Sequence, residues 1–208
     1  QRFNEIQTEL ARLATDFRNN VLDATKAFSL TLRTHDEADG LPPALLAITA
    51  QAARDADEPQ ATAENGPWRI THDHAVYHPF MMHSRNRAAR EQLCRASATR
   101  ASSGDLDNSP LIEQTLALRR EMAALLGYVS YAELSLSRKT ARTVEAVDAL
   151  IAQLADAARD AAQREADDLL AFARAHGFEG TSLEPWDTAF WAERQREHVY
   201  AYSDEELS

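Results

Sequence analysis

The chain has 208 residues, a formal net charge of −11 and 44% hydrophobic residues. This length and apolar content are enough to bury a core, which excludes a disordered tail. Glycine and proline are scarce, at 6 and 7 residues, while alanine, leucine, glutamate, arginine and glutamine are abundant. These are good helix formers, so the composition predicts an all-α protein.

The net charge argues against certain binding partners, and the single cysteine indicates the cellular compartment. A surface of this charge repels phosphate backbones and anionic membranes, which argues against nucleic-acid and membrane partners. No apolar run is long enough to span a bilayer. One cysteine, Cys94, excludes a disulfide framework and favours a reducing, cytoplasmic compartment.

The first half of the chain predicts two helices and one strand. Apolar residues recur at helical spacing from Phe3 onward and predict a first helix to about Leu32. A second helix is predicted from Leu41–Pro43 to about Ala56. One short β element is predicted near residues 68–72, with Trp68–Thr71 as its strand and the only strand expected.

The second half predicts helices only, each with a recognisable start or stop. Ser109 followed by Pro110 indicates a helix start, and Gly127 a stop. Ser130 with Glu133 forms a capping box, and Thr143 caps a long helix that ends before Gly177. The predicted helices are Tyr77–His83, Asn86–Ala101, Ser109–Leu126, Ser130–Lys139, Thr143–His176 and Trp186–His198.

Four histidines form the most conspicuous cluster of potential metal ligands: His72, His74, His78 and His83. On a strand, His72 and His74 would share one face, and Asp73 and Asp107 could add oxygen ligands. The spacing matches no established zinc motif, so a histidine-rich loop is the favoured interpretation and a metal site the alternative.

Three other groups of residues have alternative interpretations or a structural one. The arginines of residues 85–100 could attract peptide carboxylates, but a solvated helix face paired with acidic neighbours is favoured. Cys94 lies in an apolar helical pattern and is interpreted as a buried structural thiol, with a catalytic nucleophile as the alternative. Trp186, Asp187, Phe190 and Trp191 are interpreted as packing residues at a helix start.

The two ends of the sequence predict a segment of a longer protein. The pattern of an amphipathic helix already begins at Phe3. A capping box at Ser203–Glu206 predicts the start of another helix, of which only Leu207 and Ser208 follow. We therefore expect the chain to be truncated at both ends.

Several stretches together resemble one family. The family is the thimet-oligopeptidase family of zinc metallopeptidases, and the stretches are most similar to its oligopeptidase A group. They occur in the same order as in that family and cover nearly the whole chain. The similar stretches are Asn20–Thr25, Gly66–Thr71, Tyr77–Met81, Asn86–Leu93, Thr99–Ser102, Asp107–Ile112, Leu116–Arg119, Leu125–Tyr128, Tyr131–Leu136, Pro185–Trp191 and Tyr202–Leu207. The chain departs from the family's usual residues at His72, Cys94 and Ser97, which predicts local repacking.

The resemblance implies a mostly α-helical, neurolysin-like enzyme, a metalloendopeptidase that hydrolyses short peptides in a deep channel. It implies a zinc ion held by the two histidines of a His-Glu-x-x-His motif and a later glutamate, with the motif glutamate as general base. No His-Glu-x-x-His occurs in residues 1–208. No catalytic, cofactor-binding or metal residue can therefore be assigned, and zinc is expected in the parent enzyme but not in this chain.

Residues 1–208 are thus expected to form a helical, non-catalytic part on the N-terminal side of the channel. By itself the chain is expected to be inactive, because general-base attack needs the zinc-bound water that is missing here. Its expected partners are short peptide substrates, held jointly with the missing catalytic domain, and neither nucleic acid nor a membrane. The alternative is a non-catalytic helical module that binds peptides or partner helices.

Overall fold

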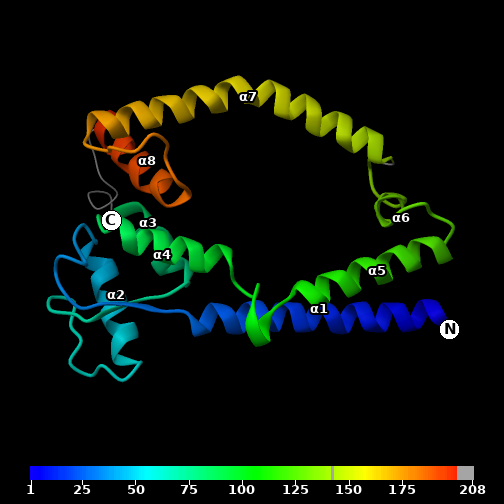
Figure 1. The fold of residues 1–208 in the computed structure, drawn as a ribbon, viewed down its shortest axis with the longest axis horizontal. Helices are drawn as coiled ribbons and strands as arrows, with labels where there is room; N and C mark the ends of the chain where they lie inside the picture. Colours follow the sequence, from blue (N-terminus) through cyan, green and yellow to red (C-terminus); the bar gives the residue numbers. More distant parts are fainter. Residues whose placement is uncertain (142, 201–208) are drawn as a thin grey trace. The chain divides into compact units, whose positions relative to one another are not determined.

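The computed structural model describes residues 1–141 and 143–200, and they form helices joined by short loops and one small sheet (Figure 1). The prediction of an all-α chain with one short β element is confirmed. No helix among these residues is both long and apolar enough to cross a membrane. The elements in chain order are α1 (Arg2–Ala27), β1 (Leu30–Leu32), α2 (Pro43–Arg54), β2 (Trp68–Ile70), α3 (His74–His83), α4 (Arg87–Ala98), a 3-10 turn η1 (Gly104–Leu106), α5 (Ser109–Leu125), α6 (Tyr131–Leu136), α7 (Val144–Ala175) and α8 (Pro185–Tyr200).

The chain divides into two compact units, each made of two stretches of sequence. The first unit comprises Gln1–Asp23 and Ala101–Glu165, and the second comprises Ala24–Arg100 and Ala166–Ser208, of which residues 201–208 lie outside the described part. The capping box predicted at Ser203–Glu206 also lies outside the described residues.

The sheet corrects one prediction. The first helix was expected to reach Leu32, but α1 ends at Ala27, and Leu30–Leu32 pair antiparallel with Trp68–Ile70. The predicted strand near Trp68 is confirmed, but it is not alone. The backbone N–H and C=O groups of a strand need a partner strand. Residues 30–32 provide it, because leucines on either side of Thr31 give the alternating pattern of a strand.

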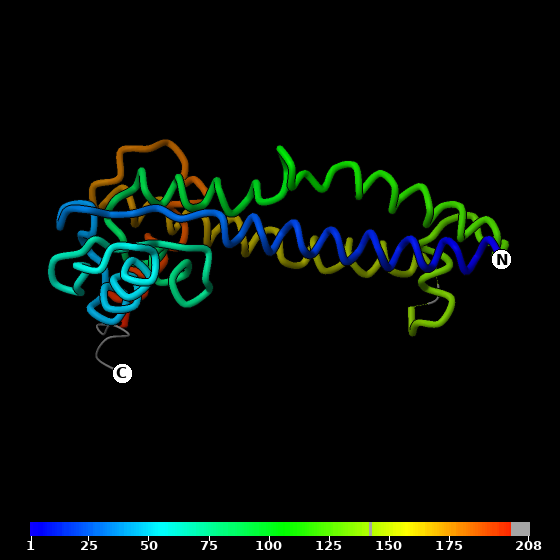
Figure 2. Tube along the Cα trace, turned by 90° about the horizontal axis from the view of Figure 1, so that it is seen from below, coloured from blue at the N-terminus to red at the C-terminus, as the bar shows by residue number. Residues whose placement is uncertain are grey.

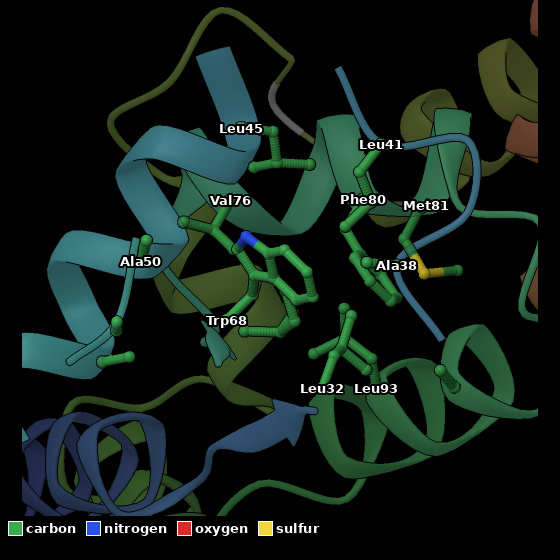
Figure 3. Packing of buried hydrophobic residues seen from close by; sticks show 14 of the residues in the cluster. Leu32, Ala38, Leu41, Leu45, Ala50, Trp68, Val76, Phe80, Met81 and Leu93 are labelled. Carbon is green, nitrogen blue, oxygen red and sulfur yellow. The ribbon is translucent and has the colours of Figure 1, made fainter. Parts of the chain in front are cut away.

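The core of the second unit is centred on Trp68, whose side chain is fully buried. Figure 3 shows its ring lying among apolar side chains of α2, α3 and β1. Its indole N–H donates to the Ala63 carbonyl at 3.1 Å, so the one polar atom of the ring has a partner. Neighbouring Gly66 adopts a φ of +65°, and a Cβ there would lie 2.7 Å from the Trp68 ring. Only glycine fits both the backbone and the space.

The first unit contains two antiparallel helices, α1 and α5, that run alongside each other (Figure 1 and Figure 2). At one end both oxygens of Glu121 accept hydrogen bonds from Arg2, each at 2.6 Å. At the other end Asn108 accepts from Asn20 and donates to the Phe17 carbonyl. Few side chains are buried here, chiefly Ile6, Leu13, Met122 and Ala123.

Most predicted helix ends are confirmed by their capping contacts. The Ser130 hydroxyl accepts from the Glu133 N–H at 3.2 Å, and Thr143 accepts from the Ala146 N–H at 3.1 Å. Gly127 and Gly177 follow their helices with positive φ. Two starts differ from the prediction. Helix α5 begins at Ser109 itself, with Asn108 at the capping position. Helix α3 begins at His74 instead of Tyr77, because the Asp73 side chain caps it by accepting from the Ala75 N–H.

Candidate functional site

The structure does not gather the four histidines at one point, although the rings of His74 and His78 lie next to each other, with centroids 4.3 Å apart. His72 is buried: its ring stacks on Phe28 at 4.4 Å, and its Nε2 lies 3.4 Å from the Leu93 carbonyl. His74 and His78 sit one turn apart on α3 and face the solvent. Within residues 1–141 and 143–200, no three histidine, cysteine or carboxylate side chains are placed to share a metal ion. The described residues therefore do not fit a metal site of that kind.

The most elaborate polar arrangement lies where α8 packs against α3 and α4, around the carboxylate of Asp187. Arg87 forms a two-pronged hydrogen bond to it, at 2.9 Å from Nε and 2.8 Å from Nη2. Arg90 contacts the same carboxylate at 3.2 Å and also donates to the carbonyls of Trp186 and Ser84. We call these three side chains, Arg87, Arg90 and Asp187, the arginine–aspartate network.

Local sequence explains how the network is positioned. Arg87 and Arg90 are three residues apart and therefore lie on one face of α4, which Asn86 caps by accepting from the Ala89 N–H. On α8, Pro185 starts the helix and Asp187 occupies its first turn. The Asp187 carboxylate also accepts from the Glu184 N–H at 3.2 Å, which is the returning half of a capping box.

Burial makes this network energetically demanding. Arg90 is 2% exposed and Asp187 is 0% exposed. Burial lowers the pKa of Arg90, and the hydrogen bond that Arg90 donates to Asp187 opposes that shift. For the more exposed Arg87 the hydrogen bond to Asp187 dominates and raises its pKa. Buried charges of this kind are tolerated only when each is paired and hydrogen-bonded, as they are here.

Aromatic rings complete the surroundings of the arginines. The Arg90 guanidinium lies 4.0 Å from the centroid of Phe190, and Arg194 stacks on the same ring from 3.4 Å. Arg194 also donates to the Met82 and His83 carbonyls at the end of α3. These contacts fasten α8 to α3 through the backbone as well as through side chains.

An open hollow of about 540 Å³ adjoins the network, between α4, α8 and the loop that joins α7 to α8. Its rim carries Arg85 and Arg87 on one side and Glu179 and Glu184 on another. The Asp187 oxygens are engaged by arginines and a backbone N–H. Because these donors already occupy its oxygens, the carboxylate is poorly placed to accept a proton from a substrate as a general base.

A second hollow of about 550 Å³ lies on the other side of Trp191, and His176 and His198 line it. Their ring centroids are 5.6 Å apart. The Nδ1 of His176 lies 2.8 Å from the Phe172 carbonyl, which assigns its proton to that nitrogen.

Several predictions for single residues can now be compared with their positions. The arginines of α4 are paired with acidic neighbours as predicted, for example Arg95 with Glu91 at 2.8 Å. The prediction of a wholly solvated face is wrong for Arg90, which faces Asp187 inside the unit. Cys94 is half-buried against the core. The packing role of Trp186 and Phe190 is confirmed, but the ionic role of Asp187 was missed. The signal for it was an acid two residues after a helix-starting proline.

Comparison with known proteins identifies the family of this chain. A family model described as Peptidase family M3 matches residues 80–208, which include α4, α5, α7 and α8. The chain is 49% identical over all of its 208 residues to the organellar oligopeptidase A of Arabidopsis thaliana. It is 48% identical to a probable cytosolic oligopeptidase A of the same plant and 40% identical to oligopeptidase A of Salmonella typhimurium, again over its whole length. It spans 26% to 30% of the length of these relatives. The chain belongs to peptidase family M3.

Proposed function

We propose that this chain is a segment of a zinc-dependent oligopeptidase that hydrolyses short peptides. The observation that carries the proposal is the identity of 40% to 49% to proteins named oligopeptidase A over every residue of the chain. We place the enzyme in the cytoplasm, as the single half-buried cysteine and the likeness to a probable cytosolic relative suggest.

In this proposal the zinc ligands lie outside residues 1–208. The sequence has no His-Glu-x-x-His, and its described side chains do not fit a metal site. The ion would supply an activated water for attack on a peptide bond. This chain would contribute helices to the non-catalytic, N-terminal side of the peptide channel. Its residues would have a structural role there and would take no part in proton transfer.

The role proposed for the arginine–aspartate network is to hold α8 in place. Together the three side chains tie α4 to residues about a hundred positions further along the chain.

The test compares the 208-residue chain with the complete gene product in a fluorogenic-peptide assay. We expect the complete protein to cleave the peptide, to lose activity with a chelator and to recover it with zinc, while the 208-residue chain stays inactive. Chelator-sensitive cleavage by the 208-residue chain alone, or chelator-insensitive cleavage by the complete protein, would contradict the proposal. Zinc content measured on the dialysed complete protein provides a readout independent of turnover.

A further inference from the structure

The first unit carries an apolar groove of about 490 Å³ between α1 and α5. Leu10 and Leu13 line its floor, and three larger side chains stand at its edges with much of their surface in solvent. Phe17 is 38%, Ile112 46% and Leu116 56% exposed. Contiguous exposed apolar side chains in a groove mark an interaction surface rather than an ordinary solvated face.

Two arginines border this groove, Arg18 from α1 and Arg119 from α5. Among the described side chains, neither forms an ion pair with a carboxylate. Arg18 lies 3.4 Å from the Thr15 hydroxyl, and Arg119 lies over the Tyr131 ring at 4.9 Å. Arg12 on the outer side of α1 differs, since Glu9 and Asp16 both pair with it. The groove thus combines an apolar floor with a positive edge.

We propose that this groove is an internal docking surface, covered by an amphipathic helix with an acidic edge from the remainder of the same polypeptide. The proposal rests on the proposed function in one respect, because it takes the chain to be a segment of a longer protein. Relatives that match all 208 residues are more than three times as long, so ample polypeptide exists to cover the groove. An apolar helix face in an apolar groove is a recurrent mode of recognition.

Charge favours this occupant over a second copy of the chain. A two-fold contact of the groove with itself would bring the arginines at its edges close to those of the partner copy. Like charges juxtaposed in an interface oppose association. An acidic helix edge would instead supply the carboxylates that Arg18 and Arg119 lack.

The test measures the reactivity of cysteines placed inside and outside the groove with a maleimide. Leu116→Cys lies in the groove, and Gln114→Cys lies on the exposed opposite side of α5 as its matched control. All other cysteines, Cys94 included, are replaced by serine. In the complete protein we expect Leu116→Cys to react at least about tenfold more slowly than Gln114→Cys. In the 208-residue chain we expect the two to react at similar rates.

Three results would overturn the docking surface. The first is equal reactivity of the two positions in the complete protein. The second is slow reaction of Leu116→Cys in the 208-residue chain that depends on protein concentration, because that identifies a second copy as the occupant. The third is Arg119→Glu leaving the reactivity of Leu116→Cys unchanged in the complete protein, where we expect it to speed the reaction more than the neighbouring Arg120→Glu.

Peptide hydrolysis by the same variants separates the two proposals. A complete protein that cleaves peptide while Leu116→Cys reacts freely rejects the docking surface and keeps the oligopeptidase function. A complete protein that protects Leu116→Cys but shows no chelator-sensitive cleavage rejects the function and keeps the docking surface.

Discussion

The two units bury their apolar residues to very different degrees. The second unit surrounds Trp68 with apolar side chains from two helices and a sheet and adds a buried ionic network. The first unit buries little between α1 and α5, and residues 148–168 of α7 are exposed throughout. Both units have helix-forming sequences, so the difference shows that apolar periodicity identifies a helix without indicating whether its partner lies nearby in the sequence.

This contrast is measurable because the three tryptophans, Trp68, Trp186 and Trp191, all belong to the second unit. Tryptophan fluorescence therefore follows the second unit, while circular dichroism follows the helices of both. We expect chemical unfolding monitored by the two signals to give different midpoints, with the helical signal beginning to fall first.

The largest effect is expected from Phe80→Ala, which opens a cavity beside Trp68. Phe80 is fully buried, and such a change costs about 3–5 kcal/mol of unfolding free energy. Urea unfolding followed by tryptophan fluorescence measures it. Ile48→Ala, at an exposed position of α2, serves as the control and should cost less than about 1 kcal/mol. Equal effects of the two changes would contradict the placement of the core.

Asp187→Asn tests the ionic part of the second unit. It leaves the buried Arg90 without a compensating charge, and we expect a loss of about 3 kcal/mol. The control is Glu91→Gln on α4, which breaks an exposed pair with Arg95 and should cost less than about 1 kcal/mol. If Asp187→Asn were as mild as the control, the network would not hold α8.

Asn108→Ala addresses the first unit. It removes a buried side chain that accepts a hydrogen bond from Asn20 and donates one to the Phe17 carbonyl, so we expect a loss of about 1–2 kcal/mol. The loss should shift the midpoint of the circular dichroism signal and leave the fluorescence midpoint in place. Asn19→Ala, an exposed neighbour, should change neither. A shift in fluorescence would show that the two units unfold together.

His72 gives the second unit a dependence on pH. Burial lowers the pKa of His72, so below about pH 6.5 the unfolded chain binds a proton that the folded chain excludes. Stability should fall as the pH falls below that value, until the folded pKa is reached. Replacing His72 with glutamine should flatten the profile measured by fluorescence between pH 7.5 and 5.5, whereas His78→Asn at an exposed site should not.

The smallest effect is expected at Leu154 on α7, which is 61% exposed. In the 208-residue chain, Leu154→Ala should change the unfolding free energy by less than about 0.5 kcal/mol. Leu169→Ala, at a buried position of the same helix in the second unit, should cost about 2 kcal/mol or more. A large loss at Leu154 would show that α7 buries this face within the chain.

Helix positions could largely be predicted, because capping residues such as Ser130 and Thr143 act on backbone groups only three residues away. Strand β1 could not, because its identity depends on pairing with Trp68–Ile70, far along the chain. The arginine–aspartate network was missed for the same reason, since Asp187 is 97 residues from Arg90. Sequence patterns report local geometry, and these features are set by contacts between distant residues.

The large sequence separation between α4 and α8 also affects folding during synthesis of the chain. The second unit is interrupted by the whole of residues 101–165, so its earlier stretch leaves the ribosome long before α8 is made. At about 5–20 residues per second, synthesis of residues 101–184, which precede α8, takes roughly 4 to 17 seconds. During that interval Arg90 has no buried carboxylate to meet, and the faces of α3 and α4 that α8 will cover remain in water. During this interval we therefore expect the surfaces of α3 and α4 that α8 later covers to be accessible to chaperones.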